Sequence, residues 1–416
     1  MRTNDSHDRK HAARSRRGAV AYLFVIAVST ILVGTGLALV AVNRADRRVH
    51  ESVHRSTQAK YVALAGIEAA LGVMDTSPNW RRSLDNGQWS QAEPFGPGTY
   101  TLSVTDADGD LGDDEADSVV ITSTGDVAGA VSRMQVTAAP RPYKALEYAC
   151  FVQSYLEIRS GAVVAGPMRA HQEIYSDGNY DSEENALFET MPGYYINSSL
   201  QPSRYATSAL PYPQPSLSYY LALATPISGI AGGTARLSKY VLTPTTNSES
   251  PGQVNPNGIY SLNAAGKEVV IEKSHIKGTL IVHGTTKKVT FQRACWIESA
   301  GLSYPTLLIF TGGEEVDFNL DNSTLSESSE NTDFNEDGDR YDSFPTDMRG
   351  IVWTQGSYIQ IHRPYAAFTG CMIGGRIRIH DRATVNDDPS LAQQMIPGFI
   401  DPDMKIVPGT WREVQP

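Results

Sequence analysis

Two short segments of this chain place carboxylates at the spacing that divalent cations require. Residues 333–342 read Asp-Phe-Asn-Glu-Asp-Gly-Asp-Arg-Tyr-Asp, with oxygen-bearing side chains at alternate positions before a glycine. An EF-hand-type calcium loop begins in this way, because alternating oxygen ligands precede a sharp turn. The position that normally supplies a bidentate acid is Phe344, so the site would be nonstandard. The candidate ligands are Asp333, Asn335, Asp337, Asp339 and Asp342.

A second acidic segment covers residues 106–117, in a predicted connection between strands. Its carboxylates surround Gly109 and Gly112, and the candidate ligands are Asp106, Asp108 and Asp110. Like charges at this density repel one another unless a cation lies among them. Ca²⁺ is therefore the cofactor that both segments predict. The alternative for each is a solvated acidic turn without an ion.

The remaining residue types point away from enzymatic chemistry. His362 and His380 lie 18 residues apart, so stacked β-coils would bring them together, as metal ligands or as surface side chains. Cys150, Cys295 and Cys371 form no CxxC motif, permit at most one disulfide within the chain and are expected to be buried thiols. The chain has no G-x-S-x-G, phosphate-loop or H-E-x-x-H motif. We expect no enzyme activity.

The residues that could do chemistry follow an apolar run at residues 18–42, which contains no charged residue, His, Asn, Gln or Pro. At about 1.5 Å per residue such a helix reaches roughly 37 Å, enough to cross a hydrocarbon core of about 30 Å. The basic leader at residues 1–17 predicts a cytoplasmic N-terminus. We therefore expect a single-pass protein of the inner (cytoplasmic) membrane whose C-terminal part is periplasmic or extracellular. A cleaved signal peptide is the alternative.

Charge is distributed unevenly along the chain. The first 74 residues carry 11 Lys and Arg against 5 Asp and Glu, and the totals of 35 and 46 leave 24 against 41 for the rest. An acidic exported part repels phosphate backbones. We expect the membrane, but no nucleic acid, as a partner.

The helix is predicted to continue beyond the apolar run. No proline occurs from residue 43 to residue 74, and Gly72 and Pro78 signal the end of the helix. Apolar residues near helical spacing are Val49, Val53, Ala63, Ile67, Ala70 and Met74. We predict one membrane-spanning and amphipathic helix over residues 18–74. Two helices hinged at Asn43 are the alternative.

The rest of the chain is predicted to be mainly β. A polar connection over residues 80–93 leads to a small antiparallel unit at residues 92–140, with strands near 100–104, 119–122 and 134–136. Short β-runs then recur at intervals of 17 to 20 residues, and residues 154–159 match residues 357–362. We predict a right-handed parallel β-helix over residues 143–416, with an irregular insertion at about 183–256. A β-sandwich is the alternative.

The N-terminal module resembles a known family. Arg16-Arg17-Gly18-Ala19 before an apolar helix, and the alanine-rich residues 59–71, resemble PilX-like and GspK-like minor pilins. The resemblance implies that a prepilin peptidase cleaves after Gly18, leaving Ala19 first, and that the helix packs against other pilin-like subunits. Major pilins carry a glutamate five residues after the cut, where this chain has Leu23.

The C-terminal part resembles the β-helical ectodomains of large bacterial pilin-like proteins, through residues 257–260 and 349–353. Together the resemblances imply a non-enzymatic minor pilin or pseudopilin of a type IV pilus or type II secretion system, acting in assembly, adhesion or secretion at the cell surface. The alternatives are a membrane-tethered carbohydrate-active enzyme with a β-helix and a surface protein that polymerises through stacked coils.

Overall fold

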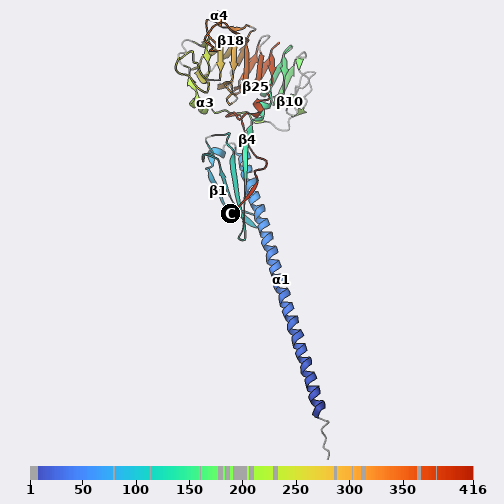
Figure 1. Ribbon diagram of the computed structural model, residues 1–416. Coiled ribbons are helices and arrows are strands. Elements are labelled where there is room, and N and C mark those ends of the chain that lie inside the picture. The colour runs from blue at the N-terminus through green and yellow to red at the C-terminus, as the bar shows by residue number, and fades with distance from the viewer. Residues whose placement is uncertain are drawn as a thin grey trace, which may run out of the picture. The chain divides into compact units, whose positions relative to one another are not determined.

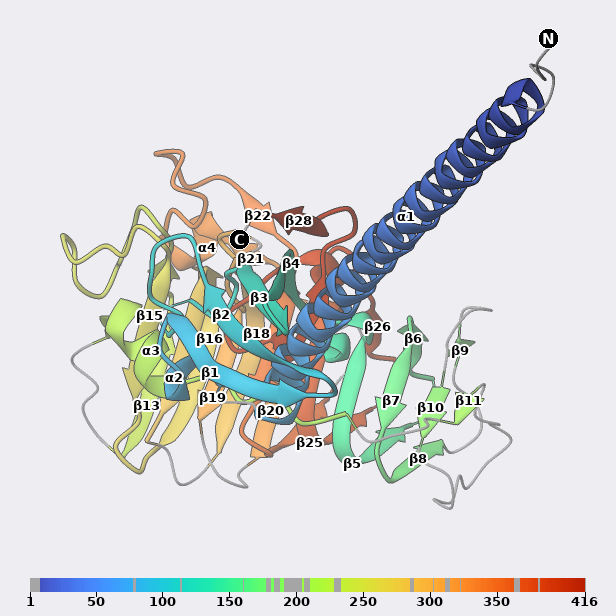
Figure 2. The ribbon, with the colours of Figure 1, turned by 90° about the horizontal axis from the view of Figure 1, so that it is seen from below.

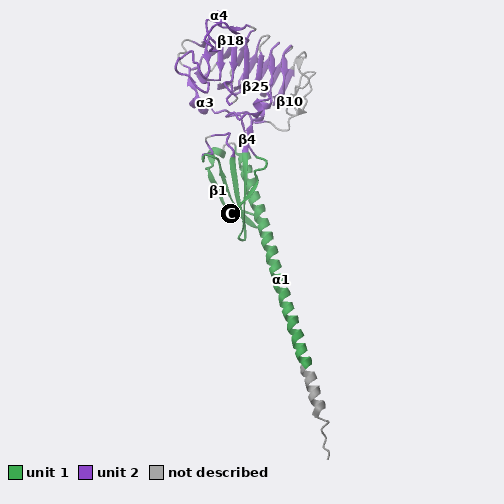
Figure 3. Cartoon of the chain, viewed as in Figure 1, with its two compact units in different colours: residues 1–109, 119–138, 406–416 green, residues 110–118, 139–405 purple. Residues whose placement is uncertain are grey.

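The computed structural model describes residues 8–77, 80–112, 114–159, 161–176, 181–182, 188–190, 204–205, 210–227, 233–284, 288–301, 303–310, 315–321, 323–362, 367–380 and 382–415. It forms two compact units, coloured separately in Figure 3. Unit 1 comprises Met1–Gly109, Val119–Ala138 and Ile406–Pro416. Unit 2 comprises Asp110–Ser118 and Ala139–Lys405. The chain is mainly β, apart from one long N-terminal helix.

Helix α1 covers Asp8–Thr76 without interruption, so the prediction of one helix is confirmed and no hinge occurs at Asn43 (Figure 1). The part from Val20 onward is long and apolar enough to cross a membrane, and the most apolar stretch has no residue buried against protein. Val49 and Val53 are also exposed, so the predicted amphipathic stripe does not begin there.

The last turns of α1 pack on strands β2 (Gly98–Thr105) and β3 (Val119–Val127). The helix residues buried there recur at three-and-four spacing and are Ala59, Val62, Ala63, Ile67, Ala70 and Met74. The approach is close, because a Cβ added to Gly125 of β3 would lie 2.2 Å from the carbonyl oxygen of Ala59. Only glycine leaves room for the helix backbone at this point.

Unit 1 carries an antiparallel sheet with more strands than predicted. Helix α2 (Trp80–Ser83) and β1 (Gly87–Phe95) occupy the segment predicted as a connection, and β1 pairs with β2. β1 lacked a sequence signal because it is an edge strand with mostly exposed side chains. Near the other end of the chain, β28 (Arg412–Val414) pairs with β4 (Ala130–Pro142), outside unit 2. The residues predicted to end the β-helix therefore complete the small sheet.

Unit 2 is built on a 20-stranded sheet whose described pairings are parallel. Its strands before residue 227 are β5 (Cys150–Ile158), β6 (Val163–Ala165), β7 (Met168–Ala170), β8 (Glu173–Ser176), β9 (Asp181–Ser182), β10 (Phe188–Thr190), β11 (Arg204–Tyr205) and β12 (Thr225–Pro226). The strands after it are β13 (Thr234–Ser238), β14 (Val241–Leu242), β15 (Ile259–Asn263), β16 (Glu268–Lys277), β17 (Thr279–His283), β18 (Val289–Glu298), β19 (Leu307–Phe310), β20 (Glu315–Asn319), β23 (Asp347–Thr354), β24 (Tyr358–Ile361), β25 (Ala367–Ile379) and β26 (Thr384–Asn386).

Outside this sheet, unit 2 contains short elements that connect or cap the strands. They are helices η1 (Lys144–Glu147), α3 (Leu217–Leu223), α4 (Glu327–Glu330) and η2 (Leu391–Gln393), and the hairpin strands β21 (Leu325–Ser326) and β22 (Ser343–Phe344). Strand β27 (Ile400–Ile406) is instead the neighbour of β4 in the small sheet. The segment predicted as an insertion is described only in part. Within it, β13 pairs in parallel with β16, so this portion belongs to the sheet.

Buried aliphatic side chains form continuous rows across the sheet. One row follows the parallel register through Ala235, Val269, Val289, Val316, Ile359, Ile377, Leu156 and Ile174, all fully buried. Figure 2 shows the strands that carry it side by side. The spatial order departs from chain order, because β5 pairs with the distant β25.

All three cysteines lie within unit 2 as free, buried thiols, as predicted. Burial raises the pKa of Cys150 and Cys295 to about 12, so both remain protonated at neutral pH. These thiols are apolar packing groups.

Candidate functional site

The acidic segment at residues 327–342, called the acidic loop below, is a closed excursion from the sheet. Strands β21 and β22 pair antiparallel at its base, with Leu325 opposite Phe344. Phe334 is fully buried in a small apolar cluster with Val241 and Ala294. The loop is thus held by apolar contacts at its base and middle.

A glutamate that the sequence reasoning did not select organises the acidic loop. Glu327 is fully buried, and its carboxylate accepts hydrogen bonds from the backbone N–H groups of Phe334, Asn335 and Asp342 at 2.6, 3.2 and 3.0 Å. Glu327 precedes the predicted ligand motif, which begins at Asp333, and does not share its alternating spacing. Glu327 sets the loop conformation by binding backbone groups from both of its arms.

The predicted ligands make hydrogen bonds within the loop. The Asp333 carboxylate accepts from two backbone N–H groups, one of them that of Gly338 at 2.9 Å. Gly338 has a φ of +92°, as the predicted sharp turn requires. The Asn335 amide donates to the carboxylates of Asp337 and Asp342 at 3.0 and 2.8 Å. The alternating side chains therefore stabilise the turn.

The oxygens that converge come from a different set. Glu327, Asp339 and Asp342 each offer one ligand oxygen within 4.8 Å of the others. Burial, together with the nearby charges of Asp337 and Asp339, raises the pKa of Asp342. These three carboxylates offer the oxygen ligands that Ca²⁺ prefers. However, three backbone N–H groups already donate to the oxygens of Glu327 and would compete with an ion for them. Calcium binding stays a prediction.

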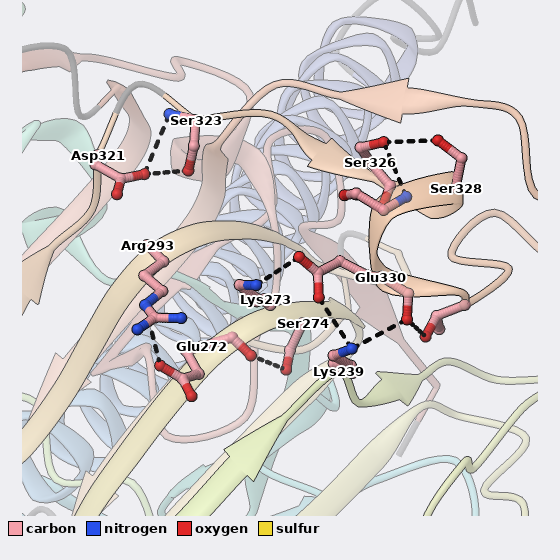
Figure 4. Close-up of polar contacts among 12 residues, drawn as sticks. Lys239, Glu272, Lys273, Ser274, Arg293, Asp321, Ser323, Ser326, Ser328 and Glu330 are labelled. Carbon is pink, nitrogen blue, oxygen red and sulfur yellow. Dashed lines mark hydrogen bonds and ion pairs between the residues drawn. The ribbon is translucent and has the colours of Figure 1, made fainter.

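Two lysines bind the acidic loop to the sheet, as Figure 4 shows. Glu330 of α4 lies 3.1 Å from the ammonium nitrogen of Lys239 and 2.5 Å from that of Lys273. Burial alone would raise the pKa of Glu330, but hydrogen bonds from the two lysines hold it below its ordinary value. Glu330 therefore anchors one end of the loop electrostatically.

The other acidic segment shows local turn contacts. In unit 1, the Asp106 carboxylate accepts from the N–H of Gly109 at 2.8 Å, and Asn86 accepts from the backbone N–H of Asp106. Asp108 is exposed in the same unit, whereas Asp110 belongs to unit 2. Calcium binding by this segment also stays a prediction.

A different part of unit 2 gathers many of the ion pairs between described residues. Side chains alternate across a strand, so the residues between the buried positions of β5, β16, β18, β20, β24 and β25 face outward. We call this surface the polar face. It presents Tyr155, Glu157, Arg159, Glu272, Lys288, Gln292, Glu315, Asp317, Tyr358, Gln360, His362, Arg376, Arg378 and His380.

The middle of the polar face is an ion-pair network. Glu315, Asp317 and His362 converge as metal ligands would. However, the Lys288 ammonium nitrogen lies 2.9 Å from Glu315 and 2.6 Å from Asp317, supplying the positive charge itself.

The rings of His362 and His380 stack with centroids 4.1 Å apart, which confirms the predicted proximity. Burial and the neighbouring His362 lower the pKa of His380, favouring its neutral form.

Next to the network lies an arginine cluster, defined as Glu157, Arg159, Arg376 and Arg378. The Glu157 side chain is only 2% exposed and pairs with all three arginines, at 3.2 Å from Arg376 and 2.5 Å from Arg378. Three guanidinium groups surround one carboxylate, so the cluster retains a charge of about +2. This positive patch lies on a chain whose net charge is −11.

A hollow of about 470 Å³ opens beside the cluster. It is lined by Gln153, Ser154, Gln172, Gly356, Tyr358, Gly375 and Arg376. The Arg376 guanidinium carbon lies 4.6 Å from the ring centre of Tyr155 and 4.7 Å from that of Tyr358. Among the described residues, the Arg376 Nε atom and the Tyr358 hydroxyl are buried without a hydrogen-bond partner.

Sequence reasoning did not single out this cluster, although one signal was present. The matching stretches at 154–159 and 357–362 place Tyr155 and Tyr358 at equivalent positions. In the structure both tyrosines are in register with Arg376, one on each side. The matching stretches therefore belong to the two strands on either side of β25. The match gives no information about Arg376, which lies on β25 between the two tyrosines.

The predicted processing residues Gly18 and Ala19 lie within helix α1. They precede the described apolar surface of that helix, which begins at residue 20.

No family model matches the chain. No curated protein matches it either. Among solved structures, the crystal structure of the competence-associated pilin ComZ from Thermus thermophilus is similar at a TM-score of 0.34 and 11% identity, over 86% of this chain and 98% of that chain.

Proposed function

We propose that this chain is a non-enzymatic, membrane-anchored protein of the pilin-like type. The observation that carries the proposal is the division of α1 into two parts. The apolar side chains of residues 20–42 are exposed, whereas between Ala59 and Met74 one face of the helix is buried against an antiparallel sheet. An exposed apolar surface of this length requires lipid or other apolar helices.

In this proposal the N-terminus is cytoplasmic, α1 crosses the inner membrane, and unit 2 is displayed in the periplasm or outside the cell. A prepilin peptidase cleaves between Gly18 and Ala19, and the freed helix packs against other pilin-like subunits. The sequence resemblance to PilX-like and GspK-like minor pilins supports this role in pilus assembly, adhesion or secretion. Leu23 replaces the glutamate of major pilins, which favours a minor subunit.

We further propose that the large sheet of unit 2 is a right-handed parallel β-helix. Its support is the repeated register: β16, β18, β20 and β24 pair in parallel at successive positions along the chain. The pairing of β5 with β25 would place the first coil of the chain inside the stack, between β25 and β8. In this arrangement β5 and the strands that follow it lie at one end of the stack, and β12 and β13 lie at the other end. The segment that contains α3 leads the chain into β12.

Mass spectrometry of the N-terminus tests the processing step. We expect the wild-type protein extracted from membranes to begin at Ala19. The variant Gly18→Arg should also be found in the membrane fraction but should still begin at Met1. The matched control is Gly34→Ala, since a Cβ there meets nothing within 4 Å. An intact leader on the wild-type protein in a strain with an active prepilin peptidase would contradict the proposal.

The non-enzymatic assignment has its own support on the polar face. Glu157, Glu272 and Asp317 each lie in an ion pair with Arg, Lys or His, so these carboxylates already have partners within the fold. Incubation of the full chain with acidic polysaccharides should leave their length distribution unchanged. Appearance of shorter products would favour the carbohydrate-active alternative.

A further inference from the structure

We propose that the hollow beside Arg376 binds an acidic saccharide, with Arg376 and Tyr358 donating hydrogen bonds to the carboxylate of a uronic acid. This goes beyond the anchoring role and does not depend on it, because the hollow lies wholly within unit 2. Binding at this position needs neither leader cleavage nor insertion into a filament.

Unsatisfied donors indicate an anionic ligand. The Arg376 Nε–H and the Tyr358 hydroxyl are buried and lack a partner among the described residues, although both residues line the hollow. A buried donor without a partner destabilises the protein, and an oxygen ligand would remove that cost. The excess positive charge around Glu157 favours a charged oxygen, and guanidinium groups match the planar geometry of a carboxylate.

The orientation of Arg376 is set before any ligand arrives. Its guanidinium lies between the rings of Tyr155 and Tyr358, and one nitrogen is paired with Glu157. Such contacts restrict the rotamers of a long side chain, so little conformational entropy is lost on binding. Burial and the charge of Glu157 raise the pKa of Tyr155 to about 12, so its ring stays neutral beside the guanidinium.

The other walls suit neutral hydroxyl groups. Gln153, Gln172 and Ser154 contribute amide and hydroxyl groups to the hollow. Gly375 and Gly356 leave bare backbone between them, since a Cβ on Gly375 would lie 2.1 Å from the Gly356 carbonyl oxygen. The volume lies within the range of small-ligand sites, about 300–1,000 Å³. A ring with one carboxylate and several hydroxyls matches this set of donors and acceptors.

The flanking charges favour a saccharide over a nucleic acid. In register with the Tyr358–Arg376–Tyr155 row, the next residues are Glu315 on one side and Glu173 on the other. A nucleic acid carries a phosphate at every nucleotide and would meet these carboxylates when it ran across the strands. A saccharide can carry its charges farther apart, with neutral residues between them.

Calorimetric titration of the full chain in detergent tests the proposal. The probes are a hyaluronan tetramer, in which uronic acid and neutral amino-sugar residues alternate, the same tetramer with its carboxyl groups reduced, and a short oligothymidylate. We expect binding of the acidic tetramer alone. Arg376→Ala should weaken it by roughly ten- to a hundred-fold, the usual effect of losing a charge-assisted hydrogen bond. Tyr358→Phe, which keeps the ring and removes only the hydroxyl, should weaken it by roughly five- to tenfold.

Arg236→Ala is the matched control. Arg236 lies on β13, in register with Arg378 but five strands away, at about 24 Å. Glu272 keeps Arg293 as a partner in this variant. Wild-type affinity of Arg236→Ala supports the site. Equal losses in both arginine variants, equal binding of the two tetramers, no binding of the acidic tetramer, or tighter binding of oligothymidylate would each overturn it. Tyr358→Phe keeps the test valid if Arg376→Ala does not fold.

Discussion

Two of the glutamates buried in unit 2 are held in opposite ways. Glu157, on β5, is 2% exposed and pairs with three arginine side chains. Glu327, at the start of α4, is fully buried and accepts three backbone N–H groups. Both avoid the large free-energy cost of a buried unpaired charge. They differ in what remains available to a ligand.

The difference separates a structural carboxylate from a binding surface. The backbone N–H groups bound to Glu327 have no further hydrogen to donate to a ligand. The hydrogen bonds of Glu327 therefore stabilise the loop and leave no donor at the surface. Arginine carries five donors, and three arginines around one carboxylate leave donors and positive charge at the surface. A charged cluster is therefore more informative about function when side chains, rather than backbone, neutralise it.

The largest effect should come from removing the backbone-bound carboxylate. Glu327→Ala leaves three N–H groups of the acidic loop unpaired, and we expect a loss of about 3 kcal/mol in the stability of that loop. Protease digestion measures it, because Tyr341 is 85% exposed and offers a cleavage site. Ser328→Ala is the control, since the described contact of that hydroxyl is with Ser326. Equal digestion of the two variants would contradict the structural role.

Neutralising the arginine-bound carboxylate should cost less. Glu157→Gln keeps the side-chain shape but removes the counterion of three guanidinium groups, and we expect a loss of about 1–2 kcal/mol in the free energy of unfolding. The arginines are partly exposed, so added salt should reduce the loss by screening their repulsion. Thermal unfolding at low and high salt measures this, with Glu298→Gln as the control. A salt-independent loss would mean that the cost is one of packing.

Acid should loosen the lysine contacts of the acidic loop. The pKa of Glu330 is lowered in the folded protein, so its stabilisation is present above the ordinary value of 4.5 and is lost as the pH falls through the folded-state pKa. The effect should be about 1 kcal/mol. The measurement is the difference in protease resistance between wild type and Glu330→Gln from neutral pH to pH 3. A difference that grows on acidification would reverse the assigned sign.

Calcium should have the smallest effect. If the acidic loop binds Ca²⁺ weakly, a concentration about fivefold above the dissociation constant stabilises it by roughly 1 kcal/mol or less. Protease resistance should rise with Ca²⁺ and not with the same concentration of Mg²⁺. Asp339→Asn removes one converging oxygen and should abolish the rise. No response to Ca²⁺, or an unchanged response in Asp339→Asn, would show that the hydrogen bonds alone neutralise the loop.

Local patterns predicted the elements better than the sites. The proline-free continuation of the apolar run predicted α1, and the spacing of His362 and His380 predicted their contact. The acidic motif predicted a tight turn but not Glu327, which contacts the turn from outside the motif. The arginine cluster was missed because Arg376 and Glu157 are 219 residues apart in the chain.

By itself, the sequence determined the long helix and which side chains of each β-run point inward, because both depend on periodicities within a few residues. Only the tertiary structure decided which strands are neighbours. Parallel strands pair through backbone groups that are alike in every strand, and the entropy of closing a longer loop rises only slowly with its length. The pairing of β5 with β25 therefore leaves no local trace, yet it brings Arg376 between two tyrosines and beside Glu157.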